Sequence, residues 1–87
     1  MKGQVVVRLR EQVLDPQGVT IGKALKTLGF EGVRELRQGK VFDVELDTAD
    51  PAEAERLLAA MAKELLANPV TESFEVHVLE GEGEAAR

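Results

Sequence analysis

Near the start of the chain stands the stretch Gln4-Val5-Val6-Val7-Arg8-Leu9-Arg10-Glu11, in which apolar and polar side chains largely alternate. Successive side chains of a strand point to opposite faces, so Val5, Val7 and Leu9 share one face while the arginines lie on the other. The pattern predicts a first strand with one buried face. The remaining elements are arranged around this strand.

Two helices are predicted, and both begin in the same way. Asp15-Pro16 and Asp50-Pro51 each place a capping carboxylate before a proline at the first helical position. The first helix is expected to end at Gly29 with a left-handed cap, and the second at Asn68-Pro69. The second helix has an apolar stripe made of Ala54, Leu57, Leu58, Met61, Leu65 and Leu66.

Three further extended runs, 33–37, 41–47 and 74–79, are predicted to be strands. The first two are separated by Gln38-Gly39-Lys40, where glycine supplies the backbone freedom that a tight turn needs. They are therefore expected to pair as a hairpin.

The order strand, helix, strand, strand, helix, strand predicts an α+β, ferredoxin-like βαββαβ fold. It has a four-stranded antiparallel sheet with two helices on one face. Residues 1–80 are expected to form a single domain, and 81–87 a flexible C-terminal tail.

Right-handed crossovers place the first strand and residues 41–47 side by side in the centre of the sheet. On the face away from the helices, the arginines at positions 8 and 10 are then expected to pair with Asp43 and Glu45. No second layer of the chain covers this face, which leaves it open to a partner.

The composition argues against nucleic-acid-binding and membrane-spanning proteins. The 87 residues include 16 acidic and 11 basic side chains, a net charge of −5 that repels phosphate backbones, so nucleic-acid binding is not expected. A chain this short buries only about 60 to 65% of its unfolded surface and has no cysteine for disulfides, so self-association is expected. No run approaches the ~20 apolar residues of a membrane span, and a cytoplasmic location is predicted.

Three features could carry chemistry, and each has a simpler explanation. The acidic row Asp43, Glu45 and Asp47 could bind a metal, but nearby arginines can neutralise it. His77, the only histidine, has no serine, threonine or cysteine within hydrogen-bond reach on its strand. The glycines of residues 18–22 lack the spacing of phosphate-binding loops. No catalytic, cofactor-binding or metal-ligating residue is therefore predicted.

Three stretches, in this order and at this spacing, resemble the PurS family, the small subunit of bacterial and archaeal phosphoribosylformylglycinamidine synthase. They are Val13-Leu14-Asp15-Pro16-Gln17-Gly18, Arg37-Gln38-Gly39-Lys40, and Leu65-Leu66-Ala67-Asn68-Pro69-Val70 followed by Glu72. The resemblance runs from about Val5 to Leu79, nearly the whole chain.

The resemblance implies a role in the fourth step of purine synthesis. In that system the glutaminase subunit PurQ releases ammonia, and the synthetase subunit PurL uses it to aminate formylglycinamide ribonucleotide. The small subunit does no chemistry: it forms a dimer or tetramer and brings PurQ and PurL together for ammonia transfer. ATP, magnesium and glutamine are used by the complex, and none is expected to be bound by this chain.

The same resemblance implies a partner interface at the first helix start, the turn at residues 37–40 and the second helix end. The candidate interface residues are Asp15, Pro16, Gln17, Gly18, Arg37, Gly39, Lys40, Asn68 and Pro69. Most have a local duty as cap, turn or terminator. Gln17 and Lys40 have none, so they are the sharper candidates.

An alternative function on the same fold is a small-ligand regulatory or binding domain with a metabolite in a dimer cleft. Calorimetry on the isolated chain separates the two, because an assembly subunit is expected to bind no metabolite tightly. An acylphosphatase-like enzyme is remote, because residues 11–15 offer neither the glycine-rich loop nor the arginine that it needs.

Overall fold

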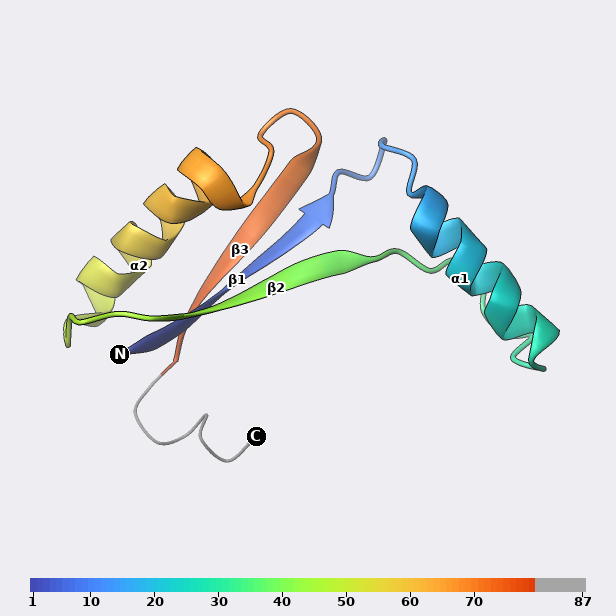
Figure 1. The fold of residues 1–87 in the computed structure, drawn as a ribbon, viewed down its shortest axis with the longest axis horizontal. Coiled ribbons are helices and arrows are strands. Elements are labelled where there is room, and N and C mark those ends of the chain that lie inside the picture. Colours follow the sequence, from blue (N-terminus) through green and yellow to red (C-terminus); the bar gives the residue numbers. More distant parts are fainter. Residues whose placement is uncertain (80–87) are drawn as a thin grey trace.

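Three antiparallel strands and two helices make up residues 1–79, the part of the chain that the computed structural model describes (Figure 1). The elements are β1 (Lys2–Leu9), α1 (Pro16–Thr27), β2 (Gly39–Glu45), α2 (Pro51–Met61) with its π-helical last turn η1 (Ala62–Leu66), and β3 (Glu72–Leu79). The tail predicted for 81–87 lies outside the described residues. The α+β class is confirmed.

The sheet has the strand order β2-β1-β3, so β1 is central as predicted. Val5 lies opposite Phe42 on one side and Val76 on the other. These three side chains share the face that α2 covers. Val5 and Val7 are fully buried, which confirms the buried face of the first strand.

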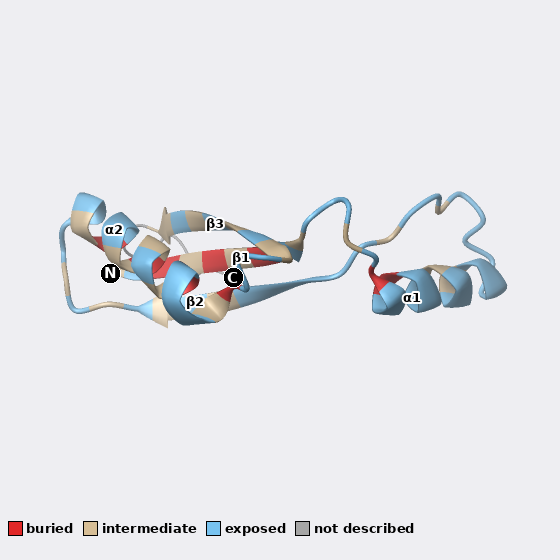
Figure 2. Ribbon diagram, turned by 90° about the horizontal axis from the view of Figure 1, so that it is seen from above, coloured by how far each residue is buried: buried red, intermediate tan, exposed pale blue. Residues whose placement is uncertain are grey.

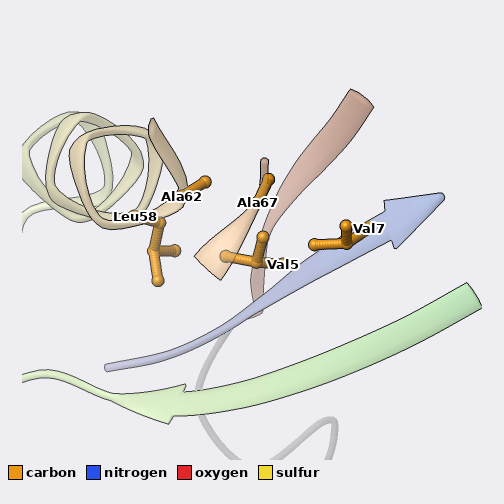
Figure 3. Close-up of a cluster of buried hydrophobic side chains, with 5 residues drawn as sticks. All are labelled: Val5, Val7, Leu58, Ala62 and Ala67. Atoms are coloured by element: carbon orange, nitrogen blue, oxygen red, sulfur yellow. The ribbon is translucent and has the colours of Figure 1, made fainter. Parts of the chain in front are cut away.

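The core lies between this face and α2, where Figure 3 shows Val5, Leu58 and Ala62 gathered together. Gly3 makes the close approach possible, because a Cβ at this position would collide with the Leu58 side chain. Ala67 completes the buried cluster just after η1.

The helix boundaries follow the predicted signals. The Asp15 carboxylate accepts a hydrogen bond from the Gly18 amide at 2.9 Å, and Asp50 accepts one from Ala52 at 3.1 Å. Gly29 has φ of 107°, a left-handed conformation that only glycine adopts readily, just beyond the end of α1.

The hairpin predicted at residues 38–40 is wrong. Residues 33–37 form no strand in the described chain, and they run straight on into β2 (Figure 1). Gly39, the first residue of β2, lets this strand approach β1 closely. A Cβ at this position would lie 2.7 Å from the Val7 carbonyl oxygen. The glycine serves a close approach between strands rather than a turn.

The expected position of the first helix is also wrong for a single chain. Figure 2 shows α1 beyond the end of the sheet, with only α2 over the strands. α1 packs against its own residues 33–37, where Gly22 lies near the Leu36 side chain. Within residues 1–79 the sheet therefore has three strands and one covering helix, not four and two.

The charge pairs predicted for the open sheet face are replaced by others. The register places Arg8 opposite Gly39, and it forms an ion pair with Glu75 of β3 at 3.3 Å. Asp43 lies opposite Gln4 and accepts a hydrogen bond from it at 3.1 Å. The contacts of the buried face set this register, and the outer charges follow it.

The end of the second helix departs from its predicted stripe. The wide turn of η1 inserts an extra residue into the helical repeat, so Leu66 turns partly inward while Leu65 is 84% exposed. One leucine of the stripe is thus moved to the surface.

Replacing Leu58 tests the position of the core. Leu58→Ala is expected to lower the free energy of unfolding by about 2 to 5 kcal/mol, because it opens a cavity under α2. Val70→Ala is the control, since Val70 is largely exposed and should change stability by less than about 0.5 kcal/mol. Urea unfolding at one fixed protein concentration measures both, and equal effects would contradict this core.

Candidate functional site

The three stretches that carry the family resemblance come together at one end of the sheet. β1 ends there, and β2 and β3 begin there, so chain segments far apart in sequence become neighbours. We call this region the junction; it comprises Arg10, residues 13–18, residues 37–40 and residues 68–72. Hydrogen bonds join the start of α1 to the segment before β2, and the end of β1 to the turn after η1.

Asp15 is the centre of the junction. The residue is only 6% exposed, and its carboxylate accepts hydrogen bonds from the Gly18 amide at 2.9 Å and the Gln38 amide at 2.7 Å. The amides of Gln38 and Gly18, followed by the charge of Arg37, lower the pKa of Asp15 against the opposing effect of burial. One side chain thus caps α1 and ties it to the segment before β2.

Arg37 reinforces the same connection. Its Nη2 atom donates to the carbonyl oxygen of Val13 at 2.8 Å and to that of Arg10 at 3.1 Å. The guanidinium therefore holds the loop between β1 and α1 against residues 37–38.

Arg10 joins the third stretch to the other two. Its Nη2 donates to the Pro69 carbonyl oxygen at 2.8 Å, and its backbone amide donates to Thr71. Asn68 shapes the same turn, because its side-chain oxygen accepts from the Val70 amide at 2.9 Å. Sequence reasoning placed Arg10 on the open sheet face, and the pattern of charges alone gave no sign of this role.

Lys40 lies where β2 leaves the junction. Its ammonium group is 3.6 Å from the Glu72 carboxylate and 6.0 Å from the centre of the Phe42 ring. The Lys40 side chain is 57% exposed and that of Glu72 is 16% exposed, so Lys40 remains accessible to other molecules while it pairs with a partly buried carboxylate.

Gly18 and Gly39 lie at positions of the junction where a side chain would collide with neighbouring atoms. A Cβ on Gly18 would collide with the Leu36 carbonyl oxygen and with the Asp15 carboxylate, and a Cβ on Gly39 would crowd Val7. Gly18 is buried under the capping carboxylate. Both positions therefore need glycine for the junction to close.

The nine candidate residues thus fall into two groups. Those that build the junction are Asp15, Gly18, Arg37, Gly39 and Asn68. The others are Pro16, Gln17, Lys40 and Pro69, which are exposed, as Arg37, Gly39 and Asn68 of the first group also are. Pro16 and Gln17 border a shallow depression of about 410 Å³ together with Thr20, Ile21 and Gln38.

His77 and the acidic side chains, which were considered as catalytic or metal-binding groups, lie in surroundings that need no such role. His77 lies 3.2 Å from Glu75, two residues away on the same exposed strand face. In residues 1–79 no three His, Asp or Glu side chains gather closely enough to hold a metal ion. Helices long and apolar enough to cross a membrane are likewise missing from the described part.

Comparison with known proteins gives a consistent result. The family model named "PurS: Phosphoribosylformylglycinamidine (FGAM) synthase" matches residues 2–80. The PurS subunit of Mycobacterium leprae is 47% identical over 83% of this chain and 87% of its own length. The PurS subunit of Archaeoglobus fulgidus is 40% identical over 87% of this chain and 95% of its own.

Solved structures agree with the sequence relatives. The crystal structure of Methanocaldococcus jannaschii PurS has a TM-score of 0.84 and 36% identity, covering 93% of this chain and 98% of that one. A chain of the Thermotoga maritima PurLQS structure has a TM-score of 0.82 and 35% identity, covering 90% of this chain and 95% of that one.

Asp15→Asn tests the central role of the carboxylate. Because the folded-state pKa lies below the unfolded value of about 3.9, the charged form stabilises the fold fully above that value, and this contribution is lost as the pH falls through the folded pKa. Wild type is thus expected to have the higher Tm at pH 7, with a gap that narrows below about pH 4. Thermal unfolding from pH 7 to 2.5 measures this; a gap independent of pH would contradict the assignment.

Proposed function

The chain belongs to the PurS family of phosphoribosylformylglycinamidine synthase, and we propose that it is the non-catalytic assembly subunit of that enzyme in purine biosynthesis. In this role it brings the glutaminase subunit PurQ and the synthetase subunit PurL together for ammonia transfer. The observation that carries the proposal is its likeness, over nine-tenths of its length, to a chain of a PurLQS complex.

The shape of the single chain supports an assembly role. Its Cα radius of gyration is 16.1 Å, whereas a compact domain of this length has one of about 12 Å. Leu14, Leu28, Phe30 and Val70 are all largely exposed. A chain that leaves so much apolar surface uncovered needs partners to bury it.

We further propose that the four-stranded sheet with two helices on one face is completed by self-association. Within residues 1–79, the segment 33–37 pairs with no strand, and α1 lies away from the sheet. A second copy supplies the missing strand and helix, which makes the dimer, or a tetramer built from it, the working form.

We also propose which subunits bind the small molecules, where the complex works and which residues touch the larger subunits. ATP, magnesium and glutamine are bound by PurL and PurQ rather than by this chain, and the complex works in the cytoplasm. The junction residues Asp15, Gly18, Arg37, Gly39 and Asn68 shape the surface, and Pro16, Gln17, Lys40 and Pro69 contact the larger subunits.

Self-association is tested first. The isolated protein is expected to sediment as a dimer or larger species at micromolar concentration, because a single chain leaves the apolar side chains of Leu14, Leu28 and Phe30 uncovered. Sedimentation velocity over a dilution series measures the species. A monomer at every concentration up to 100 times the lowest would contradict the proposal.

The contact surface is tested by a double substitution. Gln17→Ala with Lys40→Ala is expected to weaken complex formation about tenfold or more, since both side chains are accessible and neither holds the fold. Glutamine-dependent activity titrated with the small subunit measures the loss, and circular dichroism checks the fold. Lys2→Ala, at the other end of the sheet, is the control; equal activity curves for all three proteins would remove Gln17 and Lys40 from the interface.

A further inference from the structure

The outer edge of β3 has no neighbouring strand within residues 1–79, and Figure 1 shows β3 at one margin of the sheet. β3 is eight residues long, contains no proline and pairs with β1 in an unbroken register on its other side. Folded proteins usually protect such an edge with a proline, a bulge or a charged side chain that points inward. None of these is present in β3, whose inner side chains are Phe74, Val76 and Val78. The edge is therefore open to pairing with another strand.

The register shows which backbone groups of β3 point to this edge. The Arg10 amide donates to the Thr71 carbonyl oxygen at 2.9 Å, directly before the paired strands. Since every second residue pair of an antiparallel ladder exchanges hydrogen bonds, the odd-numbered residues of β3 bond to β1 and the even-numbered residues point outward. The Glu72 amide is used in the turn before β3. The residues whose amide and carbonyl groups face the open edge are Phe74, Val76 and Val78.

On the open face of the sheet, β3 carries a complementary pair of side chains. Glu75 and His77 are both about half exposed, and their side chains lie 3.2 Å apart. A carboxylate accepts hydrogen bonds, and an imidazole can donate one. When such a strand meets a second copy of itself in the antiparallel direction, the order of the two groups is reversed. Each acceptor can then lie opposite a donor.

We propose that β3 pairs antiparallel with β3 of a second copy, across a two-fold axis at Val76, and so joins two sheets edge to edge. The proposal rests on the self-association proposed above and adds a second contact to it, through which two dimers form a tetramer. The contact uses the same surface of both copies, so the assembly closes.

The side chains favour an axis at Val76 over its neighbours. Glu75 then lies opposite His77 of the second copy, and the reverse pair forms on the other side of the axis. Because this pair shares no backbone hydrogen bond, its side chains lie close, with about 4.5 Å between the Cα atoms. An axis at Glu75 would place two carboxylates opposite each other. An axis at His77 would place Glu75 opposite Leu79.

The inner face has room for the second strand. A pocket of about 540 Å³ lies between η1 and the start of β3, with Ala62, Ala67 and Phe74 among its apolar walls. In the proposed register, Val78 of the second copy lies opposite Phe74, so its side chain enters this pocket. The inner side chains of β3 are only partly buried in their own chain. Pairing therefore buries apolar surface and also satisfies the backbone groups of both edges.

Charge substitutions on the exposed face of β3 test the register. His77→Glu is expected to raise the dissociation constant of the tetramer into dimers about tenfold or more, because two carboxylates then lie opposite each other at two places. Adding Glu75→Lys restores opposite charges and is expected to bring the constant back to within about threefold of wild type. Sedimentation equilibrium measures each protein.

Gln4→Glu is the matched control. Gln4 lies opposite His77 on β1, so the substitution adds a carboxylate to the same open face, one strand away from the edge. Its dissociation constant is expected to change less than about threefold.

Engineered cysteines locate the contact directly, since the natural chain has none. A tagged Glu75→Cys variant is mixed with an untagged His77→Cys variant under reducing conditions and then oxidised. A mixed disulfide dimer is expected, because the proposed register places the two positions opposite each other. Asp43→Cys, on β2, replaces His77→Cys in the control and is expected to give at least tenfold less.

The outcomes separate the two proposals. A monomeric wild type would remove self-association and the edge contact with it. A wild type that stops at dimers, with no excess mixed disulfide, would overturn the edge contact alone, as would tetramers with equal dissociation constants for His77→Glu and Gln4→Glu. Tetramers unaffected by His77→Glu that no longer bind PurL would also overturn it and assign the β3 edge to that subunit.

Discussion

The arrangement of this chain depends on the Asp15 carboxylate. By accepting from the amides of Gly18 and Gln38, it joins the start of α1 to the segment that leads into β2. Those bonds, with the two carbonyl contacts of Arg37, direct α1 away from the sheet. An N-capping residue ordinarily acts on the start of one helix; here it also sets the direction of α1 relative to the sheet, and so decides which surfaces remain open for other molecules.

The opposite half of the molecule is built by close packing. Gly3 lets Leu58 approach β1, and the resulting core covers β1 and β3 more fully than β2. The inner face of β2 is therefore only partly covered, and apolar side chains beside it line an open groove. This incompleteness suits a subunit that works by contact, because the surface left uncovered by folding is the surface available for assembly.

The candidate site was only partly predictable from the sequence. The three stretches do meet in space, and Asp15, Gly18 and Arg37 hold them together there, while most of their other residues are exposed. Asp15 and Asn68 act as caps, as their local signals indicated. Gly39 is needed for a close strand contact, which no local pattern shows. Arg10 was missed because its bond to Pro69 depends on how β1 and the turn before β3 come together.

The sequence by itself determined both helix starts, the end of α1 and the buried face of β1, because caps, prolines and alternating side chains act over only a few residues. Only the tertiary structure decided whether residues 38–40 would turn back or run straight. Both paths satisfy the same local pattern around Gly39. The choice depends on contacts between segments more than twenty residues apart, from Asp15 to Gln38 and from Val7 to Gly39, which no local pattern encodes.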